Sequence, residues 1–277
     1  MNHIPTYARF QWLNHPTVNK VLKRFMKPNT RGRKGYDKIY MFSWLMYKQL
    51  MGCTYRDLES MTGIDYSTFI KFRRRLSTQG WFSDTFSVLS SFVGKYLNGI
   101  SLILDSSFVE TYSKHQETGS GYSGYKEKNG YKLHQFIDYQ SRLPLLQSVS
   151  AGNIADINGG YHLLERAPPD WNVRTFAADK GYDSEYFVNS IIEKWDSKVA
   201  IPMRNFKYGG SDLNRTIRGA QRSRSIKLYR QRTEIERYFS RKKNVFNLGE
   251  EKTRHLENFR DNCHFTAIME ILEWLSR

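Results

Sequence analysis

Hydrophobic positions along the chain follow two different periods, and the change falls near residue 99. Before that point apolar residues recur at helical spacing, as over 38–51, which is rich in Met, Trp, Tyr and Leu and stops at Gly52, a residue that commonly ends helices. After it, short apolar runs predict strands, at 102–105, 131–139, 145–150, 173–178 and 198–202. Helices are predicted near 156–166, 184–195, 225–247 and 256–275. This order predicts an α/β fold, a mixed sheet flanked by helices, preceded by a small all-α part.

Two of the predicted strands end in an aspartate. Asp105 directly follows the apolar run 102–104, and Asp179 stands at the exit of 173–178, ahead of Gly181. Taken singly, such an aspartate is more often a turn former or a helix cap than a ligand. A buried strand with a carboxylate at its tip is nevertheless a common way to build a functional site.

A third acid lies on the predicted helix 225–247. Tyr229, Arg232, Glu236 and Lys243 stand at offsets 0, 3, 7 and 14, so they fall within about 60° on one helical face. An apolar stripe lies beside them and consists of Leu228, Ile235, Phe239 and Phe246. Glu236 is therefore expected at the rim of a core. A solvated ion pair with Arg232 and Lys243 is the alternative interpretation.

Three acids on separate elements are what a site for hard divalent cations requires. Mg²⁺ prefers oxygen ligands and keeps several waters, so a few converging carboxylates suffice. Two such ions about 4 Å apart can serve the attacking and leaving oxygens of a phosphate. Other acids are given structural roles: Glu234 is predicted to face solvent, Asp183 to cap a helix, and Asp138 and Asp156 to lie at a turn and a helix start. His134 could line the site or be structural.

Longer motifs add a family resemblance to this acidic triad. The order Asp105, Asp179, Glu236, the segments DKGYDS, GYKLHQFIDYQSRLPL and SAGNIADI, and the Tyr-x2-Arg-x3-Glu-x6-Lys series together span most of 102–247. They resemble the DDE transposases of bacterial insertion sequences. The resemblance implies a ribonuclease-H-like fold in which the three acids bind two Mg²⁺ ions, with Mn²⁺ as a substitute. It also implies that Tyr229, Arg232 and Lys243 act around the glutamate and the DNA end, and that a homodimer forms on paired ends.

Charge agrees with a DNA partner. The formal net charge is +16, and 201–243 holds 13 Lys or Arg against 3 acids. The stretch 205–224, with three glycines among arginines, is interpreted either as a basic loop that contacts DNA through Arg222 and Arg224 or as a surface loop without function. No apolar run approaches the length of a membrane span, and the first ten residues lack the apolar centre of a signal peptide. A cytoplasmic, nucleoid-associated bacterial protein is expected, with no membrane partner.

The segment 54–77 has the form of a helix-turn-helix. Thr54 caps a short helix with Asp57 three residues on, Gly63 makes the turn, and a second helix begins near Ser67. In the second helix an inward stripe is predicted for Phe69, Phe72 and Leu76, and an outward, DNA-contacting set for Thr68, Lys71 and Arg75. A plain helical hairpin with solvated basic residues is the alternative.

These observations predict a helical DNA-end-binding domain at 1–98 and a catalytic domain at 99–277. Only 56 residues separate Asp179 from Glu236, so no large insertion is expected between them. The predicted function is a transposase that cleaves DNA at its element's ends and transfers the strand into target DNA. Its partners would be the terminal inverted repeats and the target, both double-stranded. A DNA-binding protein that has lost catalysis, or a metal-dependent nuclease on the same fold, remains an alternative.

Overall fold

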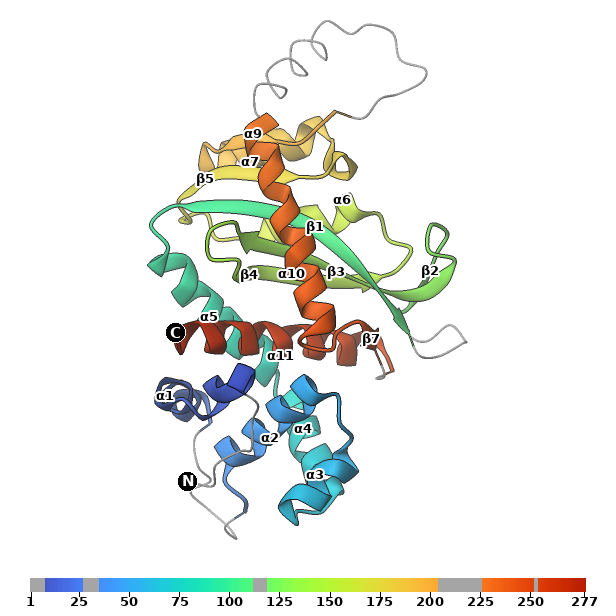
Figure 1. Ribbon diagram of the computed structural model, residues 1–277. Helices are drawn as coiled ribbons and strands as arrows, with labels where there is room; N and C mark the ends of the chain where they lie inside the picture. The colour runs from blue at the N-terminus through green and yellow to red at the C-terminus, as the bar shows by residue number, and fades with distance from the viewer. Residues whose placement is uncertain (1–7, 27–34, 112–118, 204–225, 252–253) are drawn as a thin grey trace, which may run out of the picture. The chain divides into compact units, whose positions relative to one another are not determined.

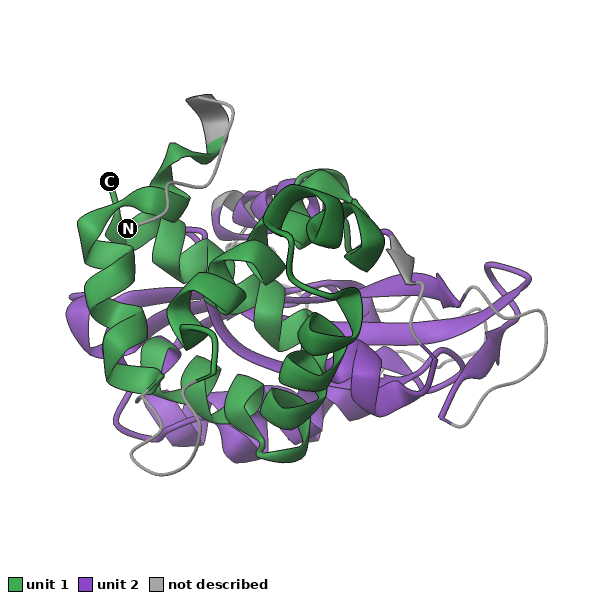
Figure 2. Cartoon of the chain, turned by 90° about the horizontal axis from the view of Figure 1, so that it is seen from below, with its two compact units in different colours: residues 1–89, 242–248, 261–277 green, residues 90–241, 249–260 purple. Residues whose placement is uncertain are grey.

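The computed structural model describes residues 8–26, 35–111, 119–203, 226–251 and 254–277. They form two compact units, each assembled from separate stretches of the chain (Figure 2). The first unit comprises Met1–Leu89, Lys242–Leu248 and Asp261–Arg277, and the second comprises Ser90–Arg241 and Gly249–Arg260. Among the described residues, no helix is both long and apolar enough to cross a bilayer.

The first unit is helical. Its elements are η1 (Ala8–Asn14), α1 (Pro16–Phe25), α2 (Lys38–Met51), α3 (Tyr55–Thr62), α4 (Tyr66–Thr78), the start of α5 (Trp81–Tyr96), the end of α10 (Thr233–Asn244) and most of α11 (Leu256–Leu275). The core contains an aromatic cluster in which the Phe265 ring meets Phe42 and Phe82 edge to face, at centroid distances of 5.3 and 5.6 Å. Phe265 belongs to α11, so the C-terminal helix supplies part of this core.

A buried ion pair joins α10 to α11 inside this unit. Lys242 Nζ lies 2.9 Å from Glu270 Oε2, and the two side chains are 1% and 2% exposed. Such a pair is costly to desolvate, and it is tolerated only because each charge has its partner.

Helices α3 and α4 form the predicted pair joined by a tight turn. Thr54 and Asp57 make a reciprocal capping box, and Gly63 takes the left-handed conformation (φ 68°) that ends α3. Helix α4 begins at Tyr66, with Asp65 as its N-cap. Burial follows the predicted stripe, since Phe69 and Leu76 are buried and Phe72 is half-buried. Of the predicted outward residues, Lys71 and Arg75 are exposed and Thr68 is half-buried.

The second unit is built on a mixed seven-stranded sheet (Figure 1). The strands are β1 (Ile100–Thr111), β2 (Gly121–Ser123), β3 (Lys128–Asp138), β4 (Pro144–Ala151), β5 (Val173–Ala178), β6 (Lys198–Ala200) and β7 (Glu250–Glu251). Their order is β2-β3-β1-β5-β6, with β4 also paired to β3 and β7 to β1. The remaining elements are α6 (Asp156–Arg166), η2 (Lys180–Tyr182), α7 (Glu185–Trp195), α9 (Ile226–Tyr229) and η3 (Arg230–Arg232). This confirms the predicted α/β class, with helices flanking a mixed sheet.

Strand β1 is longer than predicted, and this changes the place of Asp105. The strand continues to Thr111, so the aspartate lies in its middle and not at its tip. The parallel pairing with β5 ends where Leu104 meets Ala178, and β7 pairs with β1 only from Glu110. On this edge no strand of the described chain pairs with 105–109. The side chain at 105 therefore lies just beyond the carboxyl end of β5, where open α/β sheets place their sites.

Alternation along β1 assigns neighbouring residues to opposite faces of the sheet. Asp105 is opposite Gln135 on β3, and Ser106 is opposite His134. The Gln135 side chain accepts a hydrogen bond from Tyr238 of α10 at 3.4 Å, which identifies the face that α10 covers. His134 lies against Gly159 of α6, which identifies the other face.

A candidate active site at the end of strand β5

A single guanidinium joins two of the three predicted acids. Arg232 Nη1 lies 3.1 Å from Asp105 Oδ2, and Arg232 Nη2 lies 2.7 Å from Glu236 Oε1. The Asp105 and Arg232 side chains are each 19% exposed, whereas Glu236 is 57% exposed. Strand β1 and the η3–α10 segment are thus linked by charge on the face that α10 covers.

Asp179 stands at the carboxyl end of β5, immediately after Ala178. Its side chain accepts a hydrogen bond from the Lys180 amide and caps η2. Its negative charge acts on both Asp105 and Arg232, contributing to a raised pKa of each. Arg232 therefore contacts Asp105 and Glu236 directly and is influenced by the charge of Asp179.

Asp105 is an unusually basic carboxylate. Burial is the largest influence and raises its pKa to about 6, against the lowering effects of the Ser106 amide and of Arg232. Asp179 and Asp156 raise the pKa further. A carboxylate held this way, with acids on its flanks, is stabilised in its charged form by any additional cation.

For Arg232, burial and neighbouring charges have opposite effects on the pKa. Burial by itself would lower its pKa, but Asp105 and then Tyr229, Asp179 and Glu236 raise it. The Tyr229 ring centroid lies 5.8 Å from the guanidinium carbon, within the range of a cation–π contact. Two of the groups that the sequence motif placed on the same helical face, Tyr229 and Glu236, thus lie beside Arg232.

The predicted helix 225–247 is interrupted. The α-helical stretches Ile226–Tyr229 and Thr233–Asn244 are separated by the 3₁₀ turn Arg230–Arg232. Lys243 is half-buried on α10, in the stretch that belongs to the first unit. The prediction of one continuous α-helix is therefore wrong at 230–232. The angles between the motif residues change there, because a 3₁₀ turn winds more tightly than an α-helix.

The prediction that Glu234 faces solvent is wrong. Its residue is 8% exposed, and its carboxylate is paired with Arg142, at 2.8 Å from Nε, and with Arg237. Two arginines make this burial possible, and the partner on the β3–β4 turn is too distant in sequence for helical periodicity to reveal.

Two further structural interpretations are resolved. The N-cap of α7 is Ser184, whose hydroxyl accepts from the Phe187 amide, and not Asp183. His134 is fully buried with its Nε2 2.8 Å from the Ser150 hydroxyl, and burial lowers the pKa of its imidazole to about 4. It is a neutral packing residue and does not line an open site.

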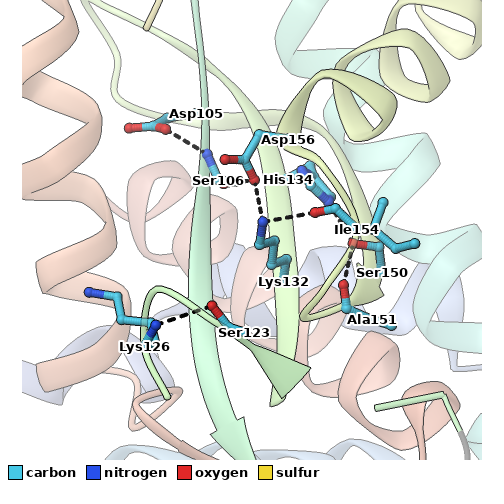
Figure 3. A network of polar contacts seen from close by, with 10 residues as sticks. All are labelled: Asp105, Ser106, Ser123, Lys126, Lys132, His134, Ser150, Ala151, Ile154 and Asp156. Atoms are coloured by element: carbon cyan, nitrogen blue, oxygen red, sulfur yellow. Dashed lines mark hydrogen bonds and ion pairs between the residues drawn. The ribbon is translucent and has the colours of Figure 1, made fainter. Parts of the chain in front are cut away.

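Two other groups lie beside Asp105 that sequence reasoning did not assign to the site. Asp156, predicted only as a helix start, is bonded to Ser106 and to Lys132 (Figure 3). Tyr182, from DKGYDS, is 1% exposed, and burial followed by the charges of Asp105 and Asp156 raises the pKa of its hydroxyl, which stays protonated. The GYDS part of the motif could have suggested the tyrosine, but the lysine lies on a strand with no local signal.

The chemistry of the donor set fits a divalent cation. Asp105, Asp179 and Glu236 offer only oxygen ligands, and burial together with the neighbouring acids raises the pKa of Asp105, so a bound cation would stabilise its charged form. In the described part of the chain no three His, Cys, Asp or Glu side chains are grouped so that they could hold an ion. Asp105 and Glu236 are each paired with Arg232 instead. Of the predicted DNA contacts, Arg222 and Arg224 lie outside the described residues.

The fold is similar to that of proteins of known structure. The piggyBac transposase, solved by cryo-EM in a synaptic complex with hairpin DNA, aligns with 94% of this chain and 70% of its own, at a TM-score of 0.54 and 11% identity. At this identity the likeness is one of fold. The Mos1 transposase in a paired-end complex with the left transposon end also aligns, over 90% and 89% of the two chains at 13% identity, but its TM-score is only 0.25.

The family is established by sequence. The transposase DDE domain family matches residues 99–271, and the chain belongs to this family of transposases. DDE transposases generally use divalent metal ions. No curated protein matches the chain.

Proposed function

We propose that this transposase cuts DNA at the ends of its mobile element and joins the freed 3′-hydroxyl to target DNA. The observation that carries the proposal is the Arg232 guanidinium bridging Asp105 and Glu236 beside the carboxyl end of β5. We assign the three acids, Asp105, Asp179 and Glu236, as the residues that hold the catalytic ions. The antiparallel β1, β3 and β4 followed by parallel β5 and β6 support a ribonuclease-H-like core.

Divalent ions held by these acids would activate a water or a 3′-hydroxyl and stabilise charge on the phosphate and its leaving oxygen. We favour Mg²⁺, with Mn²⁺ as a substitute, because all three donors are carboxylates. Both reaction steps are phosphoryl transfers, so the protein supplies mainly positioning and charge.

The side chains of the chain itself have distinct tasks in this proposal. Asp105 is half-buried and held on the central strand, so it sets the position of the site, whereas exposed Glu236 can adjust as DNA enters. Arg232 balances both acids in the free protein and has a planar fork suited to a phosphate once DNA is bound. The ring of Tyr229 holds that guanidinium in place, and Lys243 adds positive charge farther along α10.

Helices α3 and α4 are the proposed reader of the DNA end. The exposed side chains of Lys71 and Arg75 on α4 project away from buried Phe69 and Leu76, as in a recognition helix. Thr68 belongs to the proposed α4 surface, and Arg222 and Arg224, which lie outside the described residues, are proposed as further DNA contacts. Double-stranded terminal repeats and target DNA are the partners, and a homodimer on paired ends is proposed from the family.

Replacing Arg75 with Ala is expected to weaken binding to the terminal repeat by about tenfold or more, since a base-contacting arginine contributes about 1–3 kcal/mol. The preference of the Arg75→Ala variant for the terminal repeat over unrelated DNA should fall as well. Arg24→Ala removes the same charge from the exposed side of α1 in the same unit and serves as the control. Fluorescence anisotropy at fixed salt measures both. Equal losses for the two variants would remove Arg75 from the recognition surface.

The experiment for the whole proposal is strand cleavage and joining in Mg²⁺, with DNA carrying the repeats that flank the gene in its source genome. Cleavage followed by joining is the expected result. Specific binding without cleavage in either Mg²⁺ or Mn²⁺ would instead identify a DNA-binding protein that has lost catalysis. Cleavage without joining would identify a nuclease.

A further inference from the structure

Asp105 is followed in β1 by Ser106, which belongs to a polar cluster on the opposite face of the sheet from Arg232. Ser106, next in the strand, points toward α6, and its Oγ donates to Asp156 Oδ1 at 2.6 Å. Lys132 Nζ, from β3, donates to the same Asp156 oxygen at 2.9 Å (Figure 3). Three elements, β1, β3 and α6, are therefore joined at one carboxylate.

Lys132 also fixes where α6 begins. Its Nζ donates to the Ile154 carbonyl at 2.8 Å, two residues before the helix starts at Asp156. The N-cap residue, Ala155, provides no side-chain hydrogen bond to the helix. The Lys132 side chain is 17% exposed, so this start of α6 is held by a partly buried lysine and not by a capping side chain.

Two glycines in α6 allow the helix to come close enough for these contacts. A Cβ at Gly159 would lie 2.2 Å from His134 Nδ1, and one at Gly160 would lie 3.0 Å from Tyr182 Cδ1. His134 is fully buried and cannot move aside. The helix is thereby seated directly on β3, which brings Asp156 within hydrogen-bonding distance of Ser106.

The contacts among Ser106, Lys132 and Asp156 are linked to Asp105, the candidate metal ligand, through the backbone of β1. The Ser106 amide donates to Asp105 Oδ1 at 2.8 Å, on the stretch of β1 that lacks a partner strand toward β5 and β7. Residues 105 and 106 are paired with β3 on one edge only, so side-chain contacts add to the β3 ladder in setting their orientation. A shift of Ser106 would rotate the Asp105 carboxylate that it holds.

We propose that Lys132 and Asp156 are positioning residues, which hold Ser106 and, through its amide, set the orientation of Asp105 for cation binding. The inference rests on the proposed function, because it assumes that Asp105 is a metal ligand. Neither residue touches the DNA or the ion in this proposal. Outer partners of metal ligands are typically worth about 10–100-fold in metal affinity.

The test measures the melting temperature against MnCl₂ concentration, which reports metal binding without cleavage. Lys132→Met, Asp156→Asn and Ser106→Ala are each expected to raise the MnCl₂ concentration for half-maximal stabilisation by about tenfold. Lys132→Arg should restore much of the affinity. Lys128→Met is the matched control, since it breaks an exposed ion pair with Glu110 on the same two strands, and its response should equal that of the wild type.

The double variant Lys132→Met with Asp156→Asn should raise the MnCl₂ concentration for half-maximal stabilisation no more than the larger single change does, because both changes act through one contact. A response of Lys132→Met and Ser106→Ala equal to that of Lys128→Met would overturn the inference while leaving the metal site intact. Should Lys132→Met fail to fold, Ser106→Ala, which removes a single hydroxyl, decides the matter. A wild type that gains no stability from Mn²⁺ would overturn the proposed function and this inference together.

Discussion

Asp105→Asn is expected to lower DNA cleavage by about a thousandfold or more while leaving affinity for the DNA end within about twofold. The carboxylate is a proposed metal ligand, and charge stabilisation by a bound ion is worth several kcal/mol in the transition state, at about 1.4 kcal/mol for each factor of ten. The amide keeps the shape of the side chain and one hydrogen-bond acceptor. Single-turnover cleavage in Mg²⁺ measures the rate, and anisotropy measures the binding.

Asp183→Asn is the matched control for this change. It lies four residues beyond Asp179 in the same segment, removes the same charge, and is not assigned to the site. Its cleavage rate should stay within about twofold of the wild type. Glu236→Gln should behave as Asp105→Asn does, because both carboxylates meet Arg232. Cleavage by Asp105→Asn at the rate of the Asp183→Asn control would contradict the assignment of Asp105 as a metal ligand.

The largest effect on stability is expected from Lys242→Met, at about 3–5 kcal/mol. The change leaves the carboxylate of Glu270, 2% exposed, without the ammonium that lies 2.9 Å away. An uncompensated buried charge is far more costly than a lost surface contact. Urea unfolding, followed by circular dichroism, measures the loss.

Two companion variants separate the charge effect from a general weakness of α11. Arg277→Met breaks an ion pair with Glu273 near the end of the same helix, but that arginine is 68% exposed, so its loss should cost less than about 1 kcal/mol. Replacing Lys242 and Glu270 together with Met should recover most of the stability lost in Lys242→Met. A double variant as unstable as the single one would show that packing, and not charge, accounts for the loss.

Local pattern predicted the elements better than their lengths. Helix α6 and strand β5 begin and end where the pattern of apolar residues placed them, because α6 has one buried face and β5 is a short apolar run. Strand β1 extends six residues past Asp105, since its polar residues there meet β3 and α6, and such cross-element contacts leave no alternating apolar pattern to read.

The acids of the candidate site could be chosen from motifs, but their surroundings could not. Glu234 looked solvent-facing by its helical angle, and only the fold brings Arg142 to it. Lys132 and Asp156 are 24 residues apart, in segments that looked like an ordinary strand and helix start. Burial and ion pairing depend on which elements become neighbours in space, and a one-dimensional period carries no information about that.

The discontinuous makeup of the first unit limits how this protein can be divided. Phe265 and the Lys242–Glu270 pair contribute to the same unit as α2 and α4, although they lie more than 150 residues downstream. A fragment ending near residue 98 would leave Phe42 and Phe82 without their aromatic partner and would expose the core that α11 completes. We therefore expect that α3 and α4, the proposed reader of the DNA end, cannot be moved between transposases as a simple N-terminal fragment, because their unit also needs α11.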